Sequence, residues 1–203
     1  MIKSNINLLY ITLVFPFATF VHELGHWTTC RLLGYPARLK YNMVSHNIGE
    51  KIDKSLSFIE QIEFISTVVR KDYFIITLFG PIFSALLSIF ALRLWHIYKD
   101  NSYLRPIFYS LTLTYGTYII LLRFIFIEVD YLKNINNDFY KICDFLQLPY
   151  EKVILIIGLS ALLWSIYVIQ TYFRQAKVGE FIKVNFLLFL SLVFHYCIVF
   201  IVG

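Results

Sequence analysis

Two histidines and a glutamate form the pattern His-Glu-x-x-His at His22, Glu23 and His26. Four residues of an α-helix turn through about 400°, so histidines at this spacing lie on one face of the helix, one turn apart. Two neutral imidazoles placed in this way can bind one Zn²⁺ ion, which lowers the pKa of its bound water to about 7, while the adjacent carboxylate accepts the proton. The pattern therefore predicts metal-dependent hydrolysis, with His22 and His26 as ligands and Glu23 as the general base.

A hydrolytic zinc site needs a third protein ligand and keeps a fourth position for water. Spacing excludes two candidates for this ligand. Cys30 follows His22 by eight residues, about 12 Å along a straight helix, so the two side chains are too far apart to bind one ion. Leu32 stands six residues after His26, where a metzincin-type site carries another histidine, so that class is excluded as well.

Four carboxylates stay open as the third ligand on the residues alone. Glu60 and Glu63 lie in a segment with helical spacing of apolar residues, and some enzymes take a glutamate from a later helix. Asp130 and Asp138 lie in the polar stretch 129–139. Without the two histidines, either aspartate would be interpreted as an ordinary loop or helix-cap residue.

The elements that must position these residues are membrane helices. Hydrophobic residues make up 59% of the 203 residues and charged residues only 15%. About twenty apolar residues cross a hydrocarbon core of roughly 30 Å, and five uncharged runs approach that length: 4–21, 73–92, 106–122, 153–173 and 184–203. We therefore expect an all-α polytopic membrane protein with five transmembrane helices and the lipid bilayer as its partner. The net charge of +5 is not gathered along a basic face, which excludes nucleic acid as a partner.

Two long connections carry the remaining signals. Five crossings place the segments 30–71 and 129–151 on the same side of the membrane, so Asp130 and Asp138 share a side with the end of the His-Glu-x-x-His helix. Residues 37–44 alternate apolar and polar side chains, which predicts a half-buried strand or a short β-hairpin. Residues 56–69 place apolar side chains at helical spacing, which predicts an amphipathic interfacial helix.

These features resemble the site-2 protease (M50) family of intramembrane zinc metalloproteases, in particular its small bacterial members. The His-Glu-x-x-His helix of the family is matched by residues 22–26, its Gly-Pro motif by Gly80-Pro81, and its Asn-x-Asp motif by residues 136–138. The similarity covers residues 5–150. It implies that Asp138, rather than Asp130, is the third zinc ligand.

The resemblance also implies an activity and a place in the cell. Residues 1–150 would form the metalloprotease core with three transmembrane helices, and residues 151–203 would add two more. The protein would be a multi-pass zinc metalloendopeptidase of the bacterial inner membrane. It would hydrolyse peptide bonds of membrane-anchored or secreted peptides by means of a metal-activated water.

Two positions depart from the family pattern and motivate an alternative. Phe139 stands where the family has a glycine after its aspartate, and Ser84 stands where its Gly-Pro motif often ends in asparagine. The alternative is a catalytically inactive relative that acts as a membrane scaffold or chaperone. A third interpretation is a structural or transport protein in which the His-Glu-x-x-His pattern is a coincidence.

Overall fold

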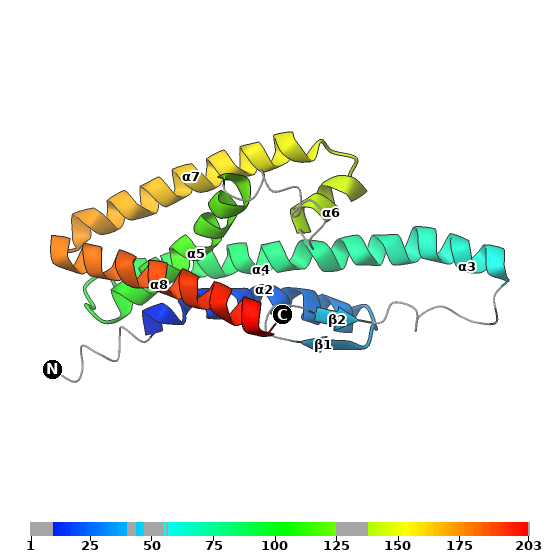
Figure 1. Cartoon of the computed structure of the whole chain (residues 1–203), viewed down its shortest axis with the longest axis horizontal. Helices are drawn as coiled ribbons and strands as arrows, with labels where there is room; N and C mark the ends of the chain where they lie inside the picture. The colour runs from blue at the N-terminus through cyan, green and yellow to red at the C-terminus, as the bar shows by residue number, and fades with distance from the viewer. Residues whose placement is uncertain (1–9, 40–43, 47–54, 56, 125–137, 203) are drawn as a thin grey trace.

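The computed structural model describes residues 10–39, 44–46, 55, 57–124 and 138–202 (Figure 1). Most of them are helical. The elements are, in chain order, α2 (Val14–Leu32), β1 (Ala37–Leu39), β2 (Val44–His46), α3 (Phe58–Phe64), the π-helical turn η2 (Ile65–Val69), α4 (Arg70–Ile97), α5 (Leu104–Phe124), α6 (Asp138–Phe145), α7 (Tyr150–Gln175) and α8 (Val178–Val202).

The helices indicate a membrane protein. Within the described part of the chain, three helical stretches are long and apolar enough to cross a bilayer, and these are Ile59–Ile97, Tyr150–Gln175 and Val178–Ile198. They include most of the predicted runs 73–92, 153–173 and 184–203. The run 106–122 lies within α5, and the run 4–21 begins in residues outside the described ranges, so the number of five spans stays a prediction.

Helix α2 begins at Val14 because the chain carries a proline close to that point. Pro16 is the third residue of α2, in the first turn, where a missing N–H breaks no helical hydrogen bond. The neighbouring N–H of Phe15 donates instead to Ser191 Oγ of α8, 3.1 Å away. The predicted helix of the first run is therefore interrupted just before Val14, and α8 supplies a partner at the interruption.

The predicted amphipathic helix differs from its expected form. The structure has no separate surface helix at residues 56–69, because α3, η2 and α4 follow one another as one long rod (Figure 1). The helical stretch Ile59–Ile97 has 39 residues and would measure about 58 Å, roughly twice the thickness of a hydrocarbon core. If α4 crosses the bilayer along this axis, α3 projects beyond it.

The predicted strand forms only part of the segment 37–44. Ala37–Leu39 is β1, which pairs antiparallel with β2 so that Ala37 lies opposite His46 and Leu39 opposite Val44. Residues 40–43 lie outside the described ranges. Trp27 of α2 donates its indole N–H to the carbonyl oxygen of Ala37 at 3.2 Å, which fastens the two-stranded sheet to the end of α2.

The main apolar cluster lies toward the other end of the bundle and draws on both halves of the chain. Trp95, Tyr109 and Tyr172 form an aromatic group within it, with the two tyrosine rings stacked at 3.9 Å between centroids. The other buried members of the cluster are Ile11, Val14, Phe15, Leu113, Val168, Val184 and Leu188. Helices α7 and α8 thus share a core with α2, α4 and α5, and the domain boundary at residue 150 stays a prediction.

Candidate metal centre

His22 and His26 lie on one face of α2, as their spacing predicted. Their ring centroids are 4.8 Å apart, with the planes nearly perpendicular at 83°. The two Nε2 atoms face each other at 3.2 Å. Both side chains are mostly buried, with 18% and 11% of their surfaces exposed. The helix therefore presents two imidazole nitrogens to one point in a largely water-excluded position.

Asp138, the first residue of α6, brings a carboxylate to the same point. Its Oδ2 lies 2.9 Å from Nε2 of His22 and 3.1 Å from Nε2 of His26. Among the described residues these three side chains form the one group that could hold a metal ion. The carboxylate that the family resemblance selected is the one that meets the histidines.

The proton positions around His26 favour a cation at this point. Its Nδ1 lies 2.7 Å from the carbonyl oxygen of Ile76, which can only accept, so Nδ1 carries the proton. In the neutral ring Nε2 is then bare and points at the bare carboxylate oxygen of Asp138. Lone pairs that converge in this way repel one another unless a proton or a metal ion lies between them.

The distances fit a metal ion of the size of zinc. Ligand atoms about 2.0–2.1 Å from a tetrahedral Zn²⁺ ion are about 3.3 Å apart, and the three separations here are 2.9, 3.1 and 3.2 Å. Two imidazoles and one carboxylate also match the donor set of hydrolytic zinc sites, which leave one position open. When a proton rather than a metal ion lies between these atoms, burial raises the pKa of the Asp138 carboxyl, but hydrogen bonds from the protonated imidazoles outweigh burial and hold the pKa below its ordinary value. The carboxylate is therefore ionised and available as a ligand.

One face of α4 supports both imidazoles. Ile76, Gly80 and Ser84 are spaced by four residues, and the outer two make hydrogen bonds to the rings. The carbonyl of Ile76 accepts from His26, and Ser84 Oγ lies 3.0 Å from Nδ1 of His22. Hydrogen bonds of this kind fix the orientation of metal-binding histidines.

Gly80 leaves the room that the imidazoles occupy. A Cβ atom at this position would overlap the ring of His26 and lie 2.8 Å from Nε2 of His22. Gly25 has the matching role on α2, because a Cβ there would lie 2.5 Å from the carbonyl oxygen of Phe79. The two glycines allow α2 and α4 to approach closely, and this approach brings the histidines to α4.

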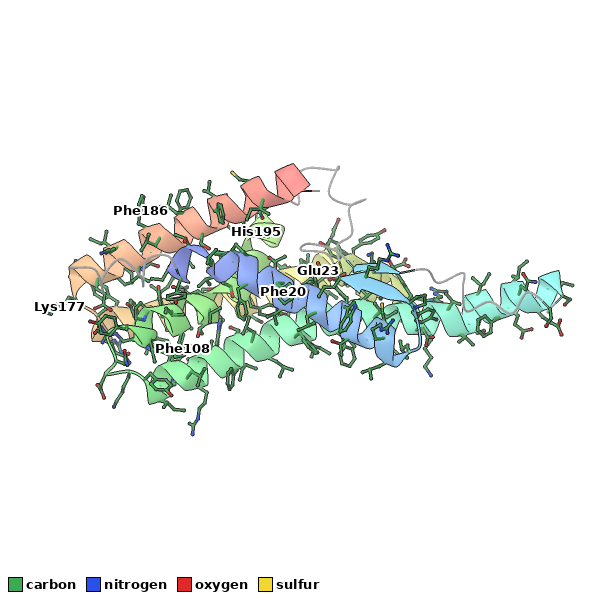
Figure 2. All side chains as sticks on the ribbon, turned by 90° about the horizontal axis from the view of Figure 1, so that it is seen from below. Phe20, Glu23, Phe108, Lys177, Phe186 and His195 are labelled. Carbon is green, nitrogen blue, oxygen red and sulfur yellow. The ribbon has the colours of Figure 1, made fainter. Side chains whose placement is uncertain are left out.

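Glu23, the predicted general base, lies beside the group of His22, His26 and Asp138 but is not one of its members. The side chain is half-buried, and its charge interacts with His22, His26, Asp138 and Lys141. Within the part of the chain that the structure describes, the carboxylate makes no hydrogen bond or ion pair. Glu23 lies at the middle of α2 (Figure 2).

The two candidate glutamates do not join the group. Asp130 lies outside the described residues. Glu60 closes a capping box at the start of α3, where its carboxylate accepts the N–H of Ser57 at 2.8 Å, and Glu63 is exposed on the same helix. Glu60 precedes Gly80 by twenty residues on the rod of α3, η2 and α4, about 30 Å away. Cys30, excluded by spacing, is buried one turn after His26.

The structure shows the surroundings of Phe139 and Ser84, the two residues that depart from the family pattern. Phe139 is the second residue of α6 and has helical backbone angles, so this position does not need the conformational freedom of glycine. The hydroxyl of Ser84, the second departure, contacts Nδ1 of His22. Sequence reasoning did not find the supporting roles of Ile76, Gly80 and Ser84. Their four-residue spacing around the Gly-Pro motif could have indicated one helix face.

Comparison of the chain with protein-family models, curated proteins and solved structures finds no match in any of the three.

Proposed function

We propose that this protein is an integral-membrane zinc metalloendopeptidase of the site-2 protease type, which hydrolyses peptide bonds of membrane-anchored or secreted peptides. The observation that carries the proposal is the convergence of His22 Nε2, His26 Nε2 and Asp138 Oδ2 from two helices far apart in the chain. The charge of Glu23 interacts with all three of these residues, and its carboxylate makes no hydrogen bond to the described residues; both features support its role as the general base.

The position of the group along α4 supports a substrate within or beside the membrane. Gly80 lies ten residues after Arg70, about 15 Å along the helix, and inside the candidate span Ile59–Ile97. Peptide bonds that reach the group are then close to the bilayer. We also propose that α2 and α5 cross the membrane with the three long apolar helices, which gives five spans in a bacterial inner membrane.

His22, His26 and Asp138 are the residues that would hold the ion. When bound, zinc supplies a Lewis acid that polarises the scissile carbonyl and lowers the pKa of water. Glu23 accepts the proton of the attacking water and then gives a proton to the departing amine. The two-stranded sheet follows α2 in the chain, and we propose that an extended substrate peptide adds to it as a further strand.

Elemental analysis of the detergent-purified protein tests the proposal. We expect stoichiometric zinc in the unsubstituted chain and its loss in His26→Ala. A chain without zinc, or a His26→Ala variant that keeps it, contradicts the metal site. Stoichiometric zinc without hydrolysis of any membrane-anchored peptide favours the inactive scaffold instead.

A further inference from the structure

The imidazoles of His22 and His26 are held by different kinds of partner. His26 donates its Nδ1 proton to the backbone carbonyl of Ile76, an acceptor that every residue at position 76 would supply. His22 meets the side chain of Ser84 instead, with 3.0 Å between Nδ1 and Oγ. The orientation of His22 therefore depends on the type of residue at position 84.

We infer that Ser84 is a positioning residue for His22: its hydroxyl accepts the Nδ1 proton and so keeps the Nε2 lone pair directed at the metal position. The inference rests on the metal site proposed above, and it states that Ser84 increases the affinity of that site for zinc. Ser84 touches neither the ion nor the substrate in this account, and it acts only through the ring of His22.

Metal binding at Nε2 requires this tautomer. Nε2 of His22 lies 3.2 Å from the bare Nε2 of His26 and 2.9 Å from Oδ2 of Asp138. A nitrogen that binds a metal carries no proton, so the single proton of the neutral ring must be on Nδ1. Nδ1 faces Ser84 Oγ, which has lone pairs to accept it. The serine hydroxyl thus satisfies the one donor that metal binding leaves on this ring.

Removal of the Ser84 hydroxyl leaves the imidazole of His22 without the contact that fixes its orientation. Without Ser84 Oγ the Nδ1–H of a mostly buried imidazole has no acceptor among the described residues in its present orientation, which favours rotation of the ring or the other tautomer. Either change takes the Nε2 lone pair away from the ion. Loss of such an outer hydrogen-bond partner lowers metal affinity by roughly 10- to 100-fold in other metal sites.

The test measures zinc affinity of the full-length, detergent-purified chain by competition with a chromophoric chelator. The variants Ser84→Thr and Ser84→Val form a matched pair of nearly equal shape, of which only the threonine keeps a hydroxyl. We expect Ser84→Val and Ser84→Ala to bind zinc about 10- to 100-fold more weakly and Ser84→Thr to bind it as the unsubstituted chain does. Ser88→Ala is the control, because Ser88 lies one turn further along α4 and donates to the carbonyl of Thr112 at 2.6 Å, away from the imidazoles.

Absorption spectra of the cobalt-loaded variants give a second readout that a purely structural role would not change. We expect the ligand-field bands to shift in Ser84→Val and Ser84→Ala and to stay in place in Ser84→Thr and Ser88→Ala. Thermal unfolding of the metal-free variants checks that each one folds.

Two outcomes overturn the inference while the metal site stands. One is unchanged zinc affinity and cobalt spectra in Ser84→Ala, and the other is equal weakening in Ser84→Thr and Ser84→Val, which would assign the effect to shape. An unsubstituted chain that binds no zinc overturns the metal site and this inference together.

Discussion

Nε2 of His22 and Oδ2 of Asp138 meet at 2.9 Å although the two residues are 116 positions apart in the chain. Helix α6, which carries Asp138, is held against the first turns of α4. The ring of Phe145 in α6 stacks on the ring of Phe74 in α4, with 4.2 Å between centroids. The guanidinium of Arg70, also in α4, lies over the ring of Phe145. Helix α4 therefore positions both partners of this contact, since it also holds His22 through Ser84.

Replacement of Asp138 by asparagine keeps the shape of the side chain and removes its charge. Because a neutral amide is a poor metal ligand, we expect zinc affinity to fall by more than about 100-fold, beyond the effect of losing an outer hydrogen-bond partner. The matched control is Asp130→Asn, the other aspartate of the same polar stretch. Competition with a chelator measures both variants. Weak binding in Asp130→Asn together with full affinity in Asp138→Asn would transfer the ligand role to Asp130.

Replacement of Glu23 by glutamine separates metal binding from catalysis. The amide cannot accept the proton of the attacking water, so we expect peptide hydrolysis to fall by about 10²- to 10⁴-fold while zinc stays bound. The measurements are zinc content and cleavage of a membrane-anchored reporter peptide. Loss of zinc in this variant would show that Glu23 is itself a ligand. Unchanged cleavage would exclude its role as the base.

The residues of the candidate site could be predicted from the sequence, but the residues of α4 that orient the two histidines could not. His22 and His26 could be paired from helical spacing alone, and the family resemblance added Asp138. The role of Ser84 could not be predicted, because the contact of its hydroxyl with His22 depends on how α2 and α4 cross at Gly25 and Gly80.

For the fold as well, features that depend on local sequence could be predicted, whereas contacts between distant parts of the chain could not. Apolar runs located the long helices, because their signal is local. The union of α3 with α4 was missed, because the segments 56–69 and 73–92 were predicted as separate elements on either side of the charged residues 70–72, whereas the backbone continues through a π-helical turn. The partner of the Phe15 N–H, Ser191, is 176 residues away, and no local pattern indicates such a contact.

Gly80 offers a steric test of the same site. The added methyl of Gly80→Ala would enter the space of the His26 ring, so we expect zinc to be lost or the free energy of unfolding to fall by about 1–3 kcal/mol. Gly179→Ala is the control, because a Cβ at Gly179 meets nothing within 4 Å. Zinc analysis and thermal unfolding report the two effects. Full zinc content and unchanged stability in Gly80→Ala would contradict the close packing of α2 on α4.

An ion pair at the other end of the bundle should control stability without affecting the metal centre. Arg105 at the start of α5 donates to both carboxylate oxygens of Glu180 at 2.7 and 2.8 Å, and Tyr172 donates its hydroxyl to the same carboxylate. This contact joins α5, α7 and α8 near the turn that contains Lys177 (Figure 2). Since hydrogen bonds to charged groups are worth about 1.5–3 kcal/mol each, with partial exposure as a discount, we expect Arg105→Ala to lower the free energy of unfolding by about 2 kcal/mol.

Arg105→Lys tests the geometry of this contact. Nη2 of Arg105 donates to both oxygens of Glu180, while Nη1 donates to the carbonyl oxygens of Lys99 and Gln175, and a single ammonium cannot serve both groups of acceptors. We expect it to recover only part of the lost stability, whereas Arg174→Ala, at an exposed position of α7, should change the melting temperature little. Zinc content should stay at the level of the unsubstituted chain in all three variants, because the metal ligands are contributed by α2 and α6 at the opposite end of the bundle. Zinc loss in Arg105→Ala, under conditions in which the protein stays folded, would mean that the two ends are coupled through α5 or α8.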